Sequence, residues 1–391
     1  MLPVFFPALV IHRQLHNYST YHRKCMVFVQ PHLVCLFYGI QLDSIVENIY
    51  VLIHENRSPL SEFLLFLYNI VQEGDNLNSQ DVTRAVIRLE IQRALRGMET
   101  TPKLTIRKLA DLGKVCAKGS VQKEIFTTFQ KLLKNPESSY YQCIEDLVKQ
   151  VDSETLTTFG MNLGYNGWTY GIRRIRACKR SSGQHVLWIS LLSCKNTPDV
   201  TAVRPVIEKG REQGVYTYAF LPDTDTSSFV SFPSVFKENP DCAFLWFQPP
   251  DFHPEHESLP ERFPNVMPLF SRSTLEHTGF MEQLKRNRIL YGVYDSYRKQ
   301  TETDVISIKN LGLLSSLGTP FLFFLSEDEK NDENSVVSHF VAEARLKQAY
   351  PFLPIDFYSD IRRIDRLITG ETPADSITKL FHRAPSSVSH Q

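Results

Sequence analysis

Three acidic residues stand where a protein of alternating strands and helices could place its chemistry. Asp295 ends one short apolar segment of the sequence, and Glu327 and Asp360 follow two others. Carboxylates that lie close together can act as a general acid and a general base, or can bind a hard cation. Asp295, Glu327 and Asp360 are therefore the candidate catalytic residues. The alternative is that they cap the helices that follow, which is a common role of aspartate.

Other polar residues at the ends of predicted strands form a candidate ligand-binding set. In a parallel barrel the carboxyl ends of the strands share one face, so side chains that follow different strands can line one cleft. The set consists of Asn162, Tyr165, Asn166, Ser193, Asp223, Gln248, Arg272, Tyr297 and Tyr358. For Asp223, helix capping is the favoured alternative, because the segment Asp-Thr-Asp-Thr-Ser that it opens is typical of a helix start.

Neither a metal nor a cofactor is expected. The loop from His253 to His256 contains two imidazoles and a carboxylate, but zinc needs further convergent donors, and Pro254 favours a solvated loop. The sequence contains no GxGxxG, GxxxxGK(S/T), GxSxG or HExxH motif. Dinucleotide-binding, P-loop, serine-hydrolase and zinc-protease functions therefore lose their main support.

Composition indicates a folded cytoplasmic protein. The 391 residues are 42% hydrophobic, and 43 Lys and Arg balance 43 Asp and Glu, which argues against nucleic acid or an anionic membrane as a partner. No apolar segment reaches the roughly 18 residues of a membrane helix. The seven cysteines are scattered without a CxxC pair, as expected for reduced thiols in the cytoplasm.

The elements that would position the candidate residues alternate from about residue 157 onward. The predicted strands are 159–164, 186–192, 215–221, 242–247, 266–270, 289–295, 320–325 and 353–358. The predicted helices between them include 200–213, 274–287, 303–317 and 335–349. Nearly continuous apolar strands that alternate with helices predict parallel strands buried on both faces. The expected fold class is α/β, a full or partial (βα) barrel, with closure left open.

Four segments are expected along the chain. Residues 1–57 form an N-terminal extension, residues 58–156 an all-helical module, residues 157–370 the barrel, and residues 371–391 a flexible tail. Residues 1–42 contain no Asp or Glu. The alternatives for them are a targeting segment or an extension upstream of the natural start, and they take no part in the functional argument.

One stretch resembles the opening of a radical SAM domain. It runs from Met161 to Gly171 (MNLGYNGWTYG) and is followed by the apolar segment VLWISLL. In that family a CxxxCxxC loop after the first strand holds a four-iron cluster, but here Gly167, Gly171 and Arg174 occupy the three positions. The resemblance covers residues 157–330. It implies a barrel without cluster ligands and without radical chemistry, because a four-iron cluster needs thiolates.

Three functional hypotheses follow. The first is a radical-SAM-like barrel that binds a peptide or small molecule at its strand-end cleft, with the helical module as a lid or as a docking element for a protein partner. The second is a (βα)-barrel enzyme of another class, hydrolase-like, that uses the three strand-end carboxylates. The third is a structural interaction protein whose helical module carries the function.

Overall fold

The computed structural model describes residues 79–98, 100–116, 120–193, 200–221, 232–252, 261–276, 279–328 and 335–371. The chain divides into two compact units. One spans Pro7–Arg93, the other contains Ala94–Gln391, and the helix α4 (Ser79–Gly97) crosses the division. The sheet and the candidate site described below belong to the unit that begins at Ala94.

Seven parallel strands form the sheet, in the same order as they occur in the chain. They are β1 (Ile189–Ser193), β2 (Thr217–Leu221), β3 (Ala243–Phe247), β4 (Val266–Ser271), β5 (Gly292–Tyr297), β6 (Phe321–Ser326) and β7 (Leu353–Asp356). The sheet curls into a half-barrel whose edge strands are β1 and β7. The predicted α/β partial barrel is thus confirmed, and seven of the eight predicted strands are present.

The connecting helices cover one face of the sheet. They are α10 (Val200–Gln213), α11 (Phe232–Glu238), α12 (Phe280–Arg286), α13 (Glu302–Val305), α14 (Ile308–Ser316) and α15 (Val336–Lys347). Aromatic side chains bind them to the strands. Phe220 of β2 lies 4.6 Å from Phe232 of α11, and Phe270 of β4 lies 4.9 Å from Phe280 of α12, measured between ring centroids. Such aromatic pairs stabilise a fold by more than the burial of their apolar surface alone would.

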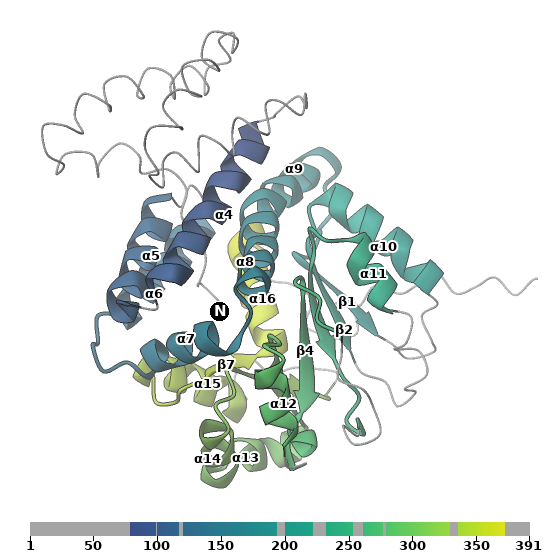
Figure 1. The fold of residues 1–391 in the computed structure, drawn as a ribbon. Coiled ribbons are helices and arrows are strands. Elements are labelled where there is room, and N and C mark those ends of the chain that lie inside the picture. Colours follow the sequence, from purple (N-terminus) through teal and green to yellow (C-terminus); the bar gives the residue numbers. More distant parts are fainter. Residues whose placement is uncertain are drawn as a thin grey trace, which may run out of the picture. The chain divides into compact units, whose positions relative to one another are not determined.

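Other helices lie on the opposite, concave side of the sheet. They are α8 (Ser153–Gly160), the π-helix η2 (Met161–Gly171), α9 (Ile172–Ser182) and α16 (Phe357–Thr369). Of these, η2 and α16 contact the strands. Figure 1 shows α8 and α16 on one side of the strands and α10 and α11 on the other. Phe357 of α16 packs 5.2 Å from Phe247 of β3, and η2 contacts β2 and β3. The concave face is therefore occupied by this chain's own helices.

The predicted strand 159–164 is wrong. These residues end α8 and begin η2. Asp152 caps the start of α8 by accepting a hydrogen bond from the Thr155 backbone N–H at 3.0 Å. A short apolar run fits a buried helix as well as a strand, so periodicity alone could not separate the two. Asn162, Tyr165 and Asn166 consequently do not follow a strand.

The last predicted strand, 353–358, is too long. The strand β7 ends at Asp356, and α16 begins at Phe357. Tyr358 and Asp360 are therefore residues of the first turn of α16, not of a loop after the sheet.

The described part of the predicted helical module is helical. After α4 come α5 (Pro102–Cys116), α6 (Ser120–Leu132) and α7 (Ser139–Gln150). The predicted domain bounds stay a prediction. Their core contains Met98, Ile106, Phe129 and Ile144. The predictions for 1–57, for 58–78 and for nearly all of the tail lie outside the described residues. Among the helices that are described, none is long and apolar enough to cross a membrane.

Candidate functional site

A cavity of about 630 Å³ lies beside β7, the last strand of the sheet. The helices α6 and α7 form one wall, α15 and α16 form another, and the first residues of β6 and β7 reach it as well. Pockets of roughly 300–1,000 Å³ commonly hold small-molecule ligands. This cavity is therefore large enough for a ligand of that size.

The interior of the cavity is mostly apolar. Ile125 and Phe129 of α6, Ile144 and Leu147 of α7, and Phe321 of β6 all line it, and all five side chains are buried. An apolar ligand would exchange water for these side chains, at a gain of roughly 25 cal/mol per Å² of apolar surface.

No further strand of the described residues pairs with the free edge of β7, and the helices α15 and α16 contact this strand. Pro354 has no backbone N–H to offer a neighbour, and its carbonyl accepts a hydrogen bond from Arg345 Nε at 2.8 Å. The helical module is fixed to the same region, since Ser139 Oγ donates to the Tyr350 carbonyl at 2.7 Å and Gln348 Nε2 donates to the Leu132 carbonyl at 2.8 Å. The bond from Arg345 occupies a carbonyl of β7 on an edge that would otherwise be open to pairing.

One ion pair dominates the electrostatics of the cavity wall. Arg345 Nη1 and Nη2 donate to the two carboxylate oxygens of Asp360 at 2.8 and 2.5 Å. Burial alone would raise the pKa of Asp360, but Arg345 outweighs burial and holds that pKa below its usual range. The Arg345 guanidinium also donates to the Pro354 carbonyl. The hydrogen-bonding groups of this ion pair are therefore bound to other parts of the protein.

Two side chains of the wall, Tyr140 and Asp356, each have a buried oxygen without a hydrogen-bond partner. The Tyr140 side chain is 5% exposed and lines the cavity, and its hydroxyl oxygen is the atom without a partner. Burial raises the pKa of Tyr140, so the hydroxyl stays protonated. An unmade hydrogen bond of a buried group costs about 1–3 kcal/mol, which a polar atom of a ligand could recover.

Burial raises the pKa of two further polar side chains of the wall. Burial raises the pKa of Cys143 to about 12, so its thiol is protonated at neutral pH. Asp356 accepts a hydrogen bond from Ser338, and burial raises the pKa of this carboxyl despite that bond.

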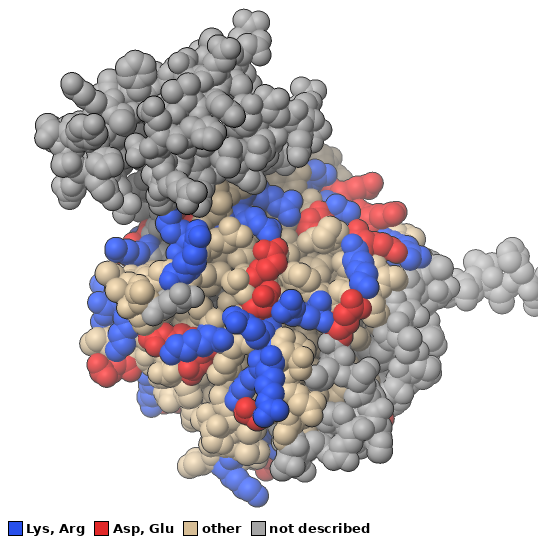
Figure 2. Space-filling view, in the orientation of Figure 1, with Lys and Arg blue, Asp and Glu red and all other residues tan. Residues whose placement is uncertain are grey.

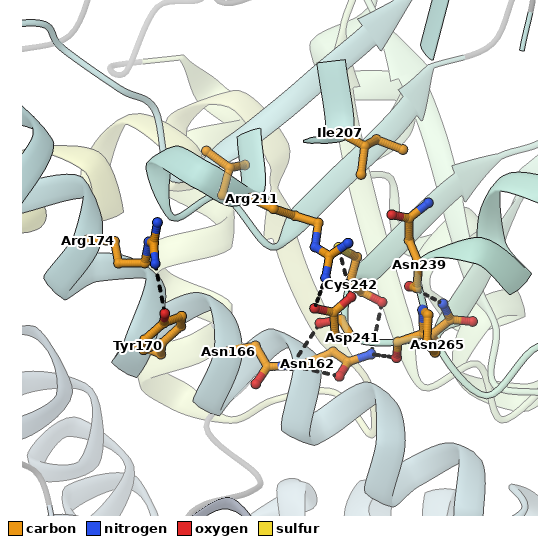
Figure 3. Close-up of polar contacts among 12 residues, drawn as sticks. Asn162, Asn166, Tyr170, Arg174, Ile207, Arg211, Asn239, Asp241, Cys242 and Asn265 are labelled. Atoms are coloured by element: carbon orange, nitrogen blue, oxygen red, sulfur yellow. Dashed lines mark hydrogen bonds and ion pairs between the residues drawn. The ribbon is translucent and has the colours of Figure 1, made fainter. Parts of the chain in front are cut away.

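Asn162 and Asn166, predicted to bind a ligand, bind the backbone. Figure 3 shows both amides turned toward the segment that enters β3. Asn162 Nδ2 donates to the carbonyls of Pro240 and Cys242 at 2.8 and 2.9 Å, and Asn166 Nδ2 donates to the carbonyl of Asp241 at 2.7 Å. These bonds join η2 to the amino end of β3, opposite the end at which a strand-end cleft was expected.

Two of the predicted residues meet at the carboxyl ends of neighbouring strands, and a third follows the next strand of the sheet. Arg272, after β4, donates to Asp295 of β5 at 2.6 Å. Burial raises the pKa of Asp295, against the effect of this arginine. Gln248, after β3, is 3% exposed, its backbone carbonyl accepts a bond from Tyr294, and its Nε2 has no partner. A ligand-binding role for them stays a prediction.

The three candidate catalytic carboxylates each pair with a different arginine. Asp295 binds Arg272, Glu327 binds Arg298, and Asp360 binds Arg345. Within the described ranges no group of three or more His, Cys, Asp or Glu side chains could hold a metal ion. The catalytic role of these residues stays a prediction.

The remaining predicted residues are dispersed. Tyr165 is buried in η2, Tyr297 is buried at the end of β5, and Tyr358 is buried in α16 against Phe357. Ser193 ends β1. Asp223 and the loop from His253 to His256 lie outside the described residues.

Sequence reasoning missed most of the cavity because it considered only strand ends. One signal was available, since Val337, Val341 and Arg345 follow one another at intervals of four residues. A charged residue that continues the apolar stripe of a helix indicates a buried partner.

Comparison of the chain with protein-family models, with curated proteins and with solved structures finds no match.

Proposed function

We propose that the protein binds a small, mostly apolar molecule in the cavity beside β7, without radical chemistry. The observation that carries this proposal is the cavity itself, an apolar space of about 630 Å³ with the partnerless hydroxyl of Tyr140 in its wall. The helical module supplies one wall through α6 and α7, which agrees with a role for it as a lid.

The chemistry of the wall favours binding over catalysis. Arg345 and Asp360 are engaged with each other, and the Cys143 thiol is held protonated by its raised pKa. A nucleophile or a general base would need to be ionised near neutral pH or to have a base beside it. Ancestry from a radical SAM barrel remains a separate proposal, which rests on the glycines at positions 167 and 171.

The test is a substitution that fills the cavity. The neutral dye N-phenyl-1-naphthylamine fluoresces strongly in apolar sites, and we expect the wild-type protein to bind it. Thr128 of α6 is exposed and lines the cavity, whereas its neighbour Thr127 is equally exposed but does not line it. Thr128→Trp should weaken dye binding at least tenfold, because the indole occupies the space of the dye.

Thr127→Trp is the matched control, since it adds the same side chain one position away. It should leave the dissociation constant within about twofold of the wild-type value. Equal binding by all three proteins would show that the dye binds elsewhere and would refute the proposed function.

A further inference from the structure

We infer that the ligand of this cavity is an amphipathic acid, an apolar chain that ends in a carboxylate, and that Arg363 on α16 binds its anionic group. This inference rests on the proposed function and adds the chemical class of the ligand. It comes from the distribution of charge around the cavity, which differs between the wall and the exposed rim.

The charged groups of the wall offer little to a charged ligand. Asp360 is bound to Arg345 through both oxygens, so neither of these two groups is available to a ligand. Asp356 accepts a hydrogen bond from Ser338 through one oxygen, and burial raises its pKa, which disfavours its charged form.

The exposed charged side chains that line the cavity are mainly basic. Arg363 and Arg366 of α16 stand three residues apart, which places them as neighbours on one helix surface. Glu124 of α6 is the single exposed acidic side chain among the lining residues that are described. The rim thus offers more positive than negative charge.

Arg363 is the arginine best suited to bind a ligand. Its side chain is exposed, and it makes no hydrogen bond or ion pair with any other residue in the described part of the chain. A guanidinium presents its N–H groups in a planar fork that matches a carboxylate. On the face drawn in Figure 2, Lys and Arg side chains are interspersed with Asp and Glu.

The positions of Arg363 at the rim and of the apolar side chains inside the cavity determine how the ligand is oriented. An acid group at Arg363 stays at the solvated rim, so it keeps much of its hydration and costs little to bind. The apolar chain then extends toward Phe129, Leu147 and Phe321, where burial of each methylene group is favourable by roughly 0.8 kcal/mol.

The experiment compares an acid with an alcohol of equal length. Decanoate and decan-1-ol are each titrated against the bound N-phenyl-1-naphthylamine, and the concentration that displaces half of the dye is measured. In Arg363→Gln this concentration should rise about tenfold for decanoate and stay within twofold for decan-1-ol. Arg286→Gln is the matched control, because Arg286 is exposed on α12 and does not line the cavity.

The outcomes separate this inference from the proposed function. If Arg363→Gln changes the displacement by decanoate no more than Arg286→Gln does, the inference is overturned while ligand binding stands. If Thr128→Trp leaves dye binding unchanged, the proposed function fails and the inference fails with it.

Discussion

Gly171→Ala should lower the free energy of unfolding by about 3 kcal/mol, the upper range for overpacking. A Cβ atom at position 171 would lie 2.3 Å from the Gly214 carbonyl oxygen and 2.9 Å from that of Asn166. Both are backbone atoms, so no side chain can rotate away. Gly214 also has a φ of +104°, a conformation that other residues rarely adopt. This close approach lets η2 pass the segment before β2.

Gly312→Ala is the matched control for this prediction. Gly312 is an exposed residue inside α14, and nothing lies within 4 Å of the position its Cβ would take. Alanine should therefore stabilise the protein by about 0.5–1 kcal/mol, the difference in helix propensity. Urea unfolding of both variants gives the comparison. A Gly171→Ala variant within 0.5 kcal/mol of wild type, on the scale of a neutral surface substitution, would contradict the packing described for η2.

Arg345→Met should cost about 3–5 kcal/mol at pH 7, the usual result of breaking a buried ion pair on one side. The side chains of Arg345 and Asp360 are 14% and 12% exposed, so the remaining carboxylate would be buried without a cation. The surface pair of Arg298 and Glu327 is 68% and 43% exposed and serves as the control. Arg298→Met should change stability by less than about 1 kcal/mol.

The cost of Arg345→Met should depend on pH. The pKa of Asp360 is lowered in the folded wild-type protein, so the pair contributes stability above the unfolded pKa of about 3.9. That contribution is lost as the pH falls through the lower, folded pKa. The difference between wild type and variant should therefore be largest near neutral pH and shrink toward pH 3. A difference that is constant from pH 7 to pH 3 would show that the ion pair is not its source.

The strands were predictable because their residues carry a local signal. The strands β2 to β6 are short runs of aromatic and aliphatic residues such as Ala243–Phe247, bounded by polar or turn-forming residues. Parallel pairing followed from the helices between them, since parallel strands need long connections. Closure of the barrel could not be predicted, because no local sequence pattern indicates whether the edge strands β1 and β7 pair with each other.

The helix η2 could not be predicted, because its stability comes from distant contacts. Its glycines at 164, 167 and 171 disfavour a helix locally. The segment 159–164 (FGMNLG), in which Asn162 is the one polar residue, suggests a strand instead. What holds it is the bonding of Asn162 and Asn166 to residues near Asp241, far along the chain. Tertiary contacts overrode the local preference.

Asp360 is the one predicted site residue that lines the cavity, and it was predicted for a reason that the structure does not bear out. Asp360 was expected to be a strand-end acid, whereas it forms the wall of the cavity together with Arg345 from α15. The cavity combines segments from four helices, and the partnerless hydroxyl of Tyr140 has no signature in the sequence. Such a site becomes visible only once α6 and α7 are packed beside β7.

Photolabelling locates the ligand directly and so tests the central claim, that this protein binds an apolar molecule beside β7. The probe is decan-1-ol with a diazirine at its far end, and labelled peptides are mapped by mass spectrometry after proteolysis. We predict labels on α6, α7 and α15, within residues 125–147 and 338–346, and their loss in Thr128→Trp but not in Thr127→Trp. Labels confined to the strand ends near Gln248 and Arg272, or labelling of Thr128→Trp equal to that of wild type, would contradict it.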